Sequence, residues 1–222
     1  MLVAIEGCDG SGKSWLVSEL ASAQIANSQC VLIRPKRCHA SQPFVQRRLS
    51  ALAALLWQSD EDTDTRHLLP DEHWVCLSAS YFHLVDRFVV RPAIRAHDLV
   101  VLDSWIDKML ARFALKGRST RERTIAAYSG VTQPDLVVLL DITPSVAADR
   151  KVEFGPSECG VFDGLDGVSR LNFEIYQGRV RQELLTRAAV CSWRVIQVDA
   201  MTPTDVLAQT VSTIAAAQRA SR

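Results

Sequence analysis

Short runs of Val, Ile and Leu alternate along the chain with longer stretches in which apolar residues recur every three or four positions. The short runs are Leu2–Ile5, Cys30–Ile33, Leu99–Leu102, Leu136–Leu140 and Arg194–Val198. Such runs are typical of strands that are buried on both faces. The longer stretches predict helices near residues 14–26, 43–57, 73–95, 104–115, 144–152, 170–189 and 203–219. This alternation predicts an α/β fold with three layers, in which helices cover both faces of a five-stranded parallel sheet.

In parallel sheets of this kind, ligands bind beyond the carboxyl ends of the strands. The candidate residues therefore follow the predicted strands directly: Glu6 to Ser14, Arg34 to Arg37, Asp103 to Trp105, Asp141 and Asp199. Asp103 is expected to bind Mg²⁺ through water or to orient a substrate, and its alternative role is a helix N-cap. Glu6 supports a metal site or accepts hydrogen bonds from loop amides. Asp141 and Asp199 are weaker candidates, because aspartate commonly ends strands and begins turns.

A phosphate-binding loop follows the first predicted strand. Gly7, four further residues and then Gly12-Lys13-Ser14 stand between an apolar strand and an amphipathic helix. Glycine lets the backbone turn its N–H groups around phosphate oxygens, and the helix adds its positive end. Lys13 can reach the β- and γ-phosphates, and the Ser14 hydroxyl suits Mg²⁺. The residues expected to bind the nucleotide are Gly7, Asp9, Gly10, Ser11, Gly12, Lys13 and Ser14.

Composition limits the other classes of function. The 222 residues suit a single domain, residues 1–222, with a sizeable core. Lys and Arg number 25 and so do Asp and Glu, so we expect neither nucleic acid nor a membrane surface as partner. The six cysteines form no C-x-x-C pairs, and no apolar run approaches ~18 residues. We therefore expect a cytoplasmic protein with reduced thiols, without a signal peptide or membrane span.

Several segments stand in an order that is characteristic of one family. Val3 to Ser14 includes the acidic residue Asp9 within the phosphate loop, Pro134 to Asp141 precedes Asp149-Arg150, and Trp193 to Ala200 contains the last predicted strand. Arg91-Pro92-Ala93-Ile94 precedes the third predicted strand. In these motifs the chain resembles the thymidylate kinase family of nucleoside monophosphate kinases, and the resemblance covers most of its length.

The resemblance implies a P-loop kinase fold with a small lid at about residues 150–170. It implies ATP and Mg²⁺ as cofactors and phosphoryl transfer to a nucleoside monophosphate, with thymidine monophosphate (dTMP) as the first candidate. Asp9 would hold the 3′-hydroxyl of the acceptor sugar, Arg150 would begin the lid, and Asp199 would lie in the loop that cradles adenine. Members of the family commonly form homodimers through apolar helices, and we expect the same here.

The acceptor side departs from the family pattern. Asp103-Ser104-Trp105 replaces Asp-Arg-Tyr, so the arginine that grips the acceptor's phosphate is missing. Counting back from Pro92, the second acceptor arginine would fall at Phe82, unless a short shift lets Arg87 serve. After the second strand, Arg34-Pro35-Lys36-Arg37 keeps the arginine of an Arg-Glu-Pro-Gly motif and replaces its carboxylate with positive charge. Arg34 and its neighbours are therefore expected to hold a phosphate.

Two aromatic residues and the lid complete the set of candidates. Phe82 and Trp105 are candidates for stacking on a base, and core packing is the commoner alternative. The lid lacks the family's Asp-Arg-x-Glu pattern, so Arg150, Lys151 and Arg170 are its candidates for the cation that covers transferring charge. The polar stretch at residues 58–66 is interpreted as an exposed loop.

The acceptor decides the mechanism. A monophosphate is already anionic near pH 7, so catalysis needs alignment and charge neutralisation by Lys13, by Mg²⁺ at Ser14 and by Arg150. A hydroxyl acceptor needs a carboxylate to take its proton, and Asp103 or Asp9 would have to serve. Two alternatives thus stay open: a kinase of a nucleoside or other small hydroxyl compound, and a non-catalytic nucleotide-binding module.

Overall fold

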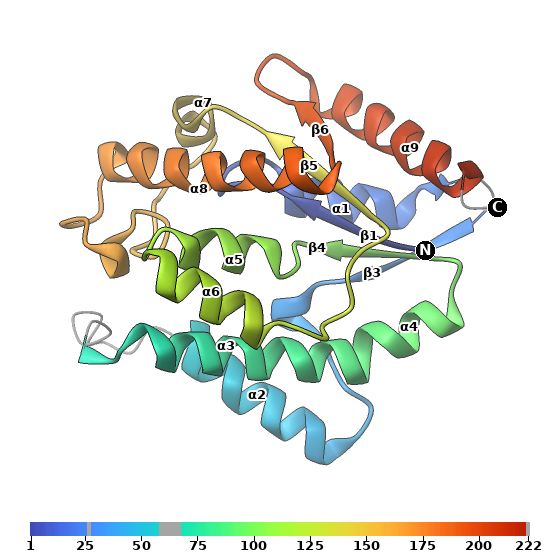
Figure 1. The fold of residues 1–222 in the computed structure, drawn as a ribbon. Helices are drawn as coiled ribbons and strands as arrows, with labels where there is room; N and C mark the ends of the chain where they lie inside the picture. The colour runs from blue at the N-terminus through green and yellow to red at the C-terminus, as the bar shows by residue number, and fades with distance from the viewer. Residues whose placement is uncertain (26–27, 58–67, 221–222) are drawn as a thin grey trace.

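A parallel sheet forms the centre of the molecule (Figure 1). The structure, a computed structural model, describes residues 1–25, 28–57 and 68–220, so the predicted loop at 58–66 lies outside the described residues. The strand order is β2-β3-β4-β1-β5-β6. The strands are β1 Leu2–Glu6, β2 Gln24–Ile25, β3 Ser28–Ile33, β4 Leu99–Asp103, β5 Leu136–Asp141 and β6 Arg194–Gln197.

The five predicted strands are confirmed, and within the described residues they pair in parallel. The two-residue strand β2 is an addition, because it pairs antiparallel with β3 at the edge of the sheet. The helix predicted near 14–26 accordingly ends earlier, since α1 covers Lys13–Ser22. The other helices are α2 Pro43–Trp57, α3 Asp71–Val85, α4 Arg91–Ala96, α5 Asp107–Ala114, α6 Arg118–Ala127, α7 Pro144–Asp149, α8 Arg170–Cys191 and α9 Pro203–Ala220.

The helix α6 was not predicted from the sequence. Its residues 118–127 are mostly polar and carry no apolar stripe, so hydrophobic periodicity gives no signal there. In the structure α6 packs against α3 and α5, and Thr124 is buried on it, with its hydroxyl donating to the Thr120 carbonyl. Tertiary packing, rather than an amphipathic pattern, stabilises this helix.

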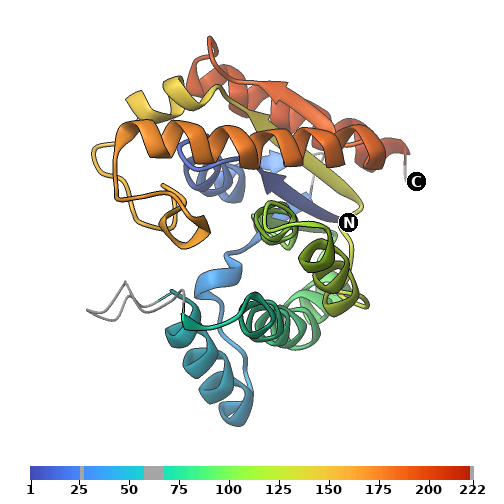
Figure 2. The same cartoon turned by 60° about the vertical axis from the view of Figure 1, so that its left-hand side comes forward.

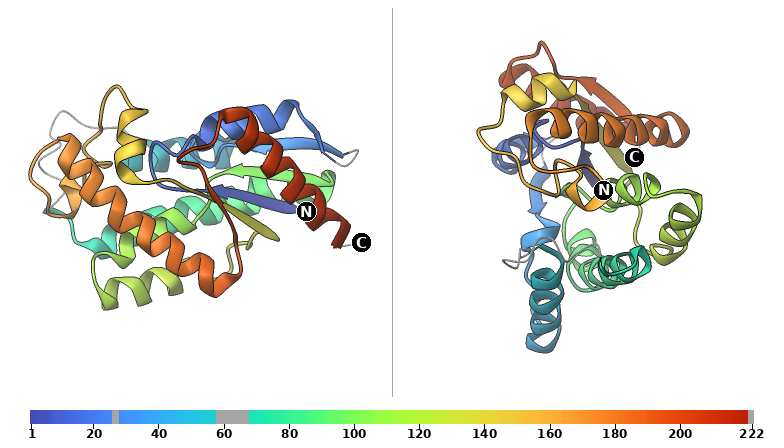
Figure 3. Two further views of the ribbon diagram at one scale, coloured as in Figure 1. Left: turned by 90° about the horizontal axis from the view of Figure 1, so that it is seen from above. Right: turned by 90° about the vertical axis from the view of Figure 1, so that its left-hand side faces the viewer.

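The sheet separates two hydrophobic cores, which explains why its strands are apolar throughout. Side chains of β1 alternate between the faces: Val3 and Ile5 pack in one core with residues of α1 and α9, and Leu2 and Ala4 pack in the other. The left view of Figure 3 shows α1 and α9 on one side of the strands and α5, α6 and α8 on the other. The predicted three-layer α/β/α architecture is therefore confirmed.

One long helical rod runs from α3 into α4, as the pattern at 73–95 predicts, but it contains a π-helical turn at Asp86–Val90. Asp86 is buried there and forms an ion pair with Arg91 at 2.8 Å. A π-turn adds a residue to the helical repeat at this point of the rod. Phe82, the position counted back from Pro92 for the second acceptor arginine, lies before this turn, on α3.

The segment between α7 and α8 lies at the carboxyl ends of the strands. It includes a short 3₁₀ turn at Val161–Asp163, and Figure 2 shows the segment below α8 and above α3. Arg112 of α5 donates to the carbonyl of Ser157, and the side-chain amide of Gln177 donates to the Glu158 carbonyl at 2.7 Å. The segment is thus attached to α5 and α8 beside the phosphate loop. Among the described helices, none is both long and apolar enough to cross a bilayer.

Candidate active site

The phosphate loop connects β1 to α1, and Lys13 lies at the first position of that helix. Its ammonium donates to the carbonyls of Gly7 and Cys8, both at 2.7 Å, and to the Ser11 hydroxyl at 3.3 Å. Lys13 is buried, whereas the neighbouring Ser14 is exposed at the start of the helix. The loop therefore surrounds a cation and presents a hydroxyl next to it, which suits a polyphosphate with a bound Mg²⁺ ion.

Glycine is required at two positions of the loop for different structural reasons. Gly10 has φ +83°, and a Cβ atom there would lie 2.7 Å from the carbonyl oxygen of Ala147. Gly12 has φ +90°, and a Cβ atom there would meet nothing within 4 Å among the described atoms. Gly10 thus permits the loop to pack against α7, whereas Gly12 is required for its backbone conformation alone.

Asp9, within the loop, contacts two cations of α5. Lys108 forms an ion pair with its carboxylate, and Arg112 lies 3.7 Å from the other oxygen. Burial raises the pKa of Asp9, but the charges of Lys108, Arg112 and Lys13 outweigh burial and hold that pKa well below its usual range. The Asp9 backbone N–H donates to Gln177 of α8 at 2.9 Å. The aspartate is therefore ionised and links the loop to two helices.

Glu6 fixes the turn that follows β4. Its carboxylate is fully buried and accepts hydrogen bonds from the Trp105 backbone N–H at 2.7 Å and from the Ser104 hydroxyl at 2.8 Å. Burial and, after it, the charge of Asp107 raise the pKa of Glu6 to about 7, although its hydrogen bonds act in the opposite direction. Of the two roles predicted for Glu6, the structure shows hydrogen bonding to a loop amide, and this bond holds Ser104 at φ +62°.

Asp103 stands at the end of β4 with a partly accessible carboxylate, 3.9 Å from the guanidinium of Arg34. The alternative role as a helix N-cap does not apply, because α5 begins four residues later at Asp107. Arg34 also donates to the Ser18 hydroxyl of α1 at 2.7 Å. Arg34 and Asp103 thus lie at the carboxyl ends of their strands, at the same edge of the sheet as the phosphate loop.

A pocket of about 510 Å³ opens beside the loop, between α3, α5 and the segment that follows α7. Phe82 and Trp105 both line it and pack edge to face, with ring centroids 5.4 Å apart. Both are nearly fully buried, and the Trp105 indole donates to the Thr132 carbonyl at 2.9 Å. These rings are therefore core residues that also form part of the pocket wall.

Four cations line this pocket, and the sequence analysis missed three of them. Lys108 and Arg112 lie four residues apart on α5, Lys116 follows in the turn after that helix, and Lys36 joins them from the turn after β3. Lys116 pairs with Asp71 at 2.9 Å and with Asp163 at 2.8 Å. The spacing was a usable signal, because side chains four positions apart share one face of a helix.

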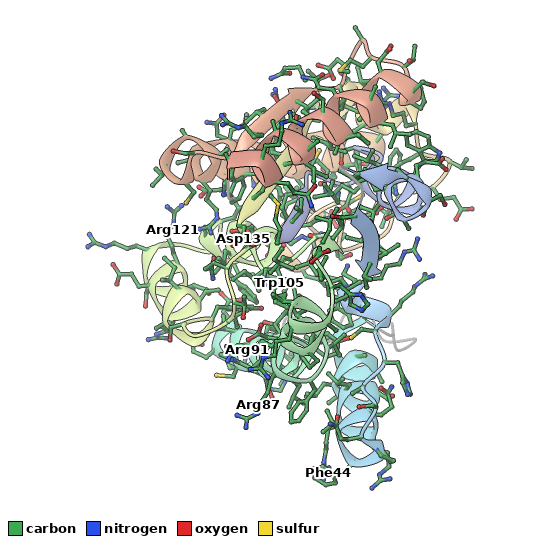
Figure 4. All side chains as sticks on the ribbon, turned by 90° about the vertical axis from the view of Figure 1, so that its right-hand side faces the viewer. Phe44, Arg87, Arg91, Trp105, Arg121 and Asp135 are labelled. Carbon is green, nitrogen blue, oxygen red and sulfur yellow. The ribbon has the colours of Figure 1, made fainter. Side chains whose placement is uncertain are left out.

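Other predicted residues lie elsewhere. Arg87 is not among the residues that line the pocket; its guanidinium lies over the Phe88 ring at 5.8 Å, and Figure 4 shows Arg87 at the outer edge of the molecule, apart from Trp105. Arg150 and Asp199 lie together beside β6: Arg150 donates to the Val198 carbonyl at 2.9 Å, and Asp199 accepts from the Thr143 backbone N–H at 2.7 Å.

The remaining lid candidates are held in ion pairs. Lys151 pairs with Glu158 at 3.0 Å, and Arg170 pairs with Asp149 at 2.7 Å and with Glu174 at 2.8 Å. Arg112 and Lys116 reach the segment after α7 from outside it: Arg112 donates to the Ser157 carbonyl, and Lys116 pairs with Asp163 at 2.8 Å.

A phosphate loop at the carboxyl edge of a parallel sheet, facing a pocket with cations and aromatic walls, defines a P-loop kinase fold. Comparison with known proteins leads to one family. The chain is 31% identical to a thymidylate kinase of Solidesulfovibrio magneticus over 95% of its own length and 96% of that protein. It is 29% identical to a thymidylate kinase of Pelodictyon phaeoclathratiforme over 93% of the chain and 91% of that relative.

A third relative, a thymidylate kinase of Chlorobium luteolum, is 31% identical over 83% of the chain and 82% of its own length. No family model matches the chain. On the strength of the full-length relatives, the chain belongs to the thymidylate kinase family, and the resemblance inferred from its motifs is confirmed.

Proposed function

We propose that this protein is an ATP- and Mg²⁺-dependent nucleoside monophosphate kinase that transfers the γ-phosphoryl group of ATP to dTMP, forming dTDP and ADP. The observation that carries the proposal is the position of the phosphate loop beside a 510 Å³ pocket with aromatic and cationic walls. The relatives named thymidylate kinases, which match over more than nine-tenths of the chain, support the same activity.

On the donor side, the loop amides and Lys13 bind the phosphates of ATP. The exposed Ser14 hydroxyl and the Asp103 carboxylate at the end of β4 are hard oxygen donors and fit Mg²⁺, directly or through water. Bound Mg²⁺ neutralises charge on the transferring group. Arg150, at the start of the lid, and Asp199 lie together beside β6 and are proposed to bind the adenine end of the nucleotide.

On the acceptor side, Phe82 and Trp105 offer ring surface to a base, and Asp9 accepts a hydrogen bond from the sugar hydroxyl. The adjacent cations outweigh the effect of burial and keep Asp9 ionised, as this role requires. Arg34 lies 3.9 Å from Asp103, and its partly exposed guanidinium is proposed to contact the phosphates. We leave Arg87 out of the acceptor site because it does not line the pocket.

Residues 150–170 are proposed to act as a lid within a single domain, residues 1–222. The contacts from Arg112 to Ser157 and from Gln177 to Glu158 support this role, because they attach the segment to both helices beside the pocket. Closure of such a segment excludes water from the transferring phosphoryl group. We also propose a cytoplasmic location, where the nucleotides are, and a homodimer, which light scattering of the purified protein would test.

An ATP-consumption assay with Mg²⁺ tests the proposal. The panel contains dTMP, the other common nucleoside monophosphates, thymidine and small hydroxyl compounds, and ³¹P NMR identifies the product. We expect ADP and dTDP to form in equal amounts. Phosphorylation of thymidine in preference to dTMP would support a nucleoside kinase instead. ATP binding without turnover in the presence of any acceptor would support a non-catalytic nucleotide-binding module.

A further inference from the structure

The face of α5 that borders the pocket carries two cations, and a third follows the helix. Lys108 and Arg112 are four residues apart and share one face of α5, and Lys116, in the turn after it, continues this row of cations along the pocket wall. Lys36, in the turn Pro35–Arg37, reaches the same pocket from the end of β3 and lies over the Trp57 ring at 5.7 Å. The row therefore meets a fourth cation at its end near the phosphate loop.

These cations differ in how their charge is compensated. Lys116, at the far end, has two carboxylate partners, Asp71 and Asp163. Lys108 and Arg112 share a single carboxylate, that of Asp9. Lys36 forms no ion pair within 4 Å in the part of the chain that the structure describes. At the end near the loop, Asp9 is thus the one ion-pair partner that the group of Lys36, Lys108 and Arg112 has among the described residues. Asp103 also lines the pocket and attracts Lys36, but it is paired with Arg34 at 3.9 Å, so positive charge stays in excess.

This excess charge lies in a confined space. The side chains of Lys108 and Arg112 are 13% and 21% exposed. Burial and the neighbouring charges of Lys13, Arg112 and Lys36 together lower the pKa of Lys108 to about 8, against the opposing effect of Asp9. Buried like charges are costly when nothing compensates them. The site is therefore complementary to a ligand that brings about two negative charges.

An unused donor points to the same ligand. The Nε atom of Arg112 is buried and, among the described residues, has no hydrogen-bond partner, although the same guanidinium donates to Ser157. A buried donor without an acceptor costs about 1–3 kcal/mol, so a ligand oxygen that accepts from it is favoured. Guanidinium and ammonium groups together are the usual partners of phosphate oxygens.

We propose that Lys36, Lys108 and Arg112 bind the phosphate dianion of the acceptor, in place of the arginine for which this chain has Ser104. The inference rests on the proposed function and makes it more specific, because a neutral nucleoside offers nothing to these charges. The residues that favour a monophosphate over a nucleoside are thus on α5 and in the turn after β3, whereas the family motif has its arginine directly after β4.

Equilibrium binding of dTMP and of thymidine, measured by calorimetry without ATP, tests this subsite. The variants are Lys36→Met, Lys108→Met and Arg112→Met, with circular dichroism to confirm folding. For Lys108→Met and Arg112→Met we expect the Kd for dTMP to rise about 10- to 100-fold, with a smaller rise for the more exposed Lys36→Met. The Kd for thymidine should change by less than about threefold. Lys108→Arg, which keeps the charge, should restore most of the affinity for dTMP.

Lys116→Met is the matched control, since it removes the same charge from the wall of the same pocket, just after α5, where two carboxylates already compensate it. It should affect dTMP and thymidine equally. If the three test variants also weaken dTMP and thymidine equally, or if the wild-type protein binds no monophosphate, the inference is wrong. Binding of dTMP that depends on these cations, without turnover in the kinase assay, would instead leave the subsite standing and contradict the proposed function.

Discussion

The two sides of the site are built on different principles. The donor side consists of a loop whose backbone surrounds Lys13, and its glycines have fixed positions because of φ and close packing. The acceptor side consists of side chains that reach one pocket from α3, α5 and the turn after β3. A backbone site must keep its sequence spacing, whereas a charge can be supplied from any element within reach. The comparison explains why this chain keeps the donor motif and departs from the family on the acceptor side.

The largest expected effect separates the two sides directly. Lys13→Ala removes the cation between the β- and γ-phosphates and should reduce kcat about 1,000-fold, or about 4 kcal/mol. The affinity for dTMP in the absence of ATP should stay at the wild-type value, because Lys13 belongs to the donor side. Steady-state kinetics and calorimetry measure the two quantities. Arg118→Ala, on an exposed helix surface, is the control, and wild-type turnover in Lys13→Ala would remove the basis of the site.

Gly10 and Gly12 test whether the loop is held by packing as well as by backbone conformation. Gly10→Ala places a methyl group 2.7 Å from the Ala147 carbonyl at φ +83°, and should lower the free energy of unfolding by about 3 kcal/mol. Gly12→Ala meets no neighbouring atom at φ +90° and should cost only about 1–2 kcal/mol. Urea unfolding at one pH compares them. Equal losses would show that contact with α7 contributes nothing.

Glu6, which connects β1 to the turn after β4, makes the free energy of unfolding of the protein depend on pH. Its pKa is raised from 4.5 to about 7 by burial and then by the charge of Asp107, so between these values the folded protein holds a proton that the unfolded chain has lost. The contribution of Glu6 to the free energy of unfolding therefore falls as pH rises from 4.5 to 7, and the decrease is complete above pH 7.

Glu6→Gln should flatten this part of the stability profile by on the order of 2 kcal/mol between pH 5 and pH 8. Urea unfolding at both pH values gives the slope, and Glu122→Gln serves as the control because that side chain is exposed. An unchanged slope in Glu6→Gln would assign the pH dependence to other groups.

The smallest expected effect concerns the boundary between the two sides. Asp103→Asn keeps the shape of the side chain and removes its charge, so kcat should fall about tenfold while the Kd for ATP in the absence of Mg²⁺ stays unchanged. The loss should shrink when Mg²⁺ is replaced by Mn²⁺, which binds most ligand sets more tightly. Equal losses in kcat and in ATP affinity would indicate that Asp103 acts only through the structure around Arg34.

The sequence predicted the sheet well, because a strand buried on both faces leaves a continuous apolar run such as Leu136–Leu140. It failed at α6, where Arg118 to Ala127 have no apolar stripe and tertiary packing forms the helix. The phosphate loop was predictable residue by residue, since its geometry depends on glycines at fixed spacing.

The acceptor side was only partly predictable from the sequence. Counting back from Pro92 places the second acceptor arginine at Phe82, and Phe82 lines the pocket. Arg87, the alternative position, lies in the π-turn at Asp86–Val90 and is not among the lining residues. Lys108 and Arg112 were not predicted because the expected acceptor position lay directly after β4. They lie further along the chain, in the first and second turns of α5. Their pairing with Asp9 depends on the tertiary fold, so no local pattern signals it.

The most direct test of the account is the ratio of kcat/KM for dTMP to that for thymidine, measured on the wild-type protein with saturating ATP and Mg²⁺. We expect rapid conversion of dTMP to dTDP and a ratio above about 100, because Lys36, Lys108 and Arg112 place excess positive charge where the phosphate of dTMP would bind. A ratio near or below one, or ATP that is bound but consumed with neither compound, would contradict it.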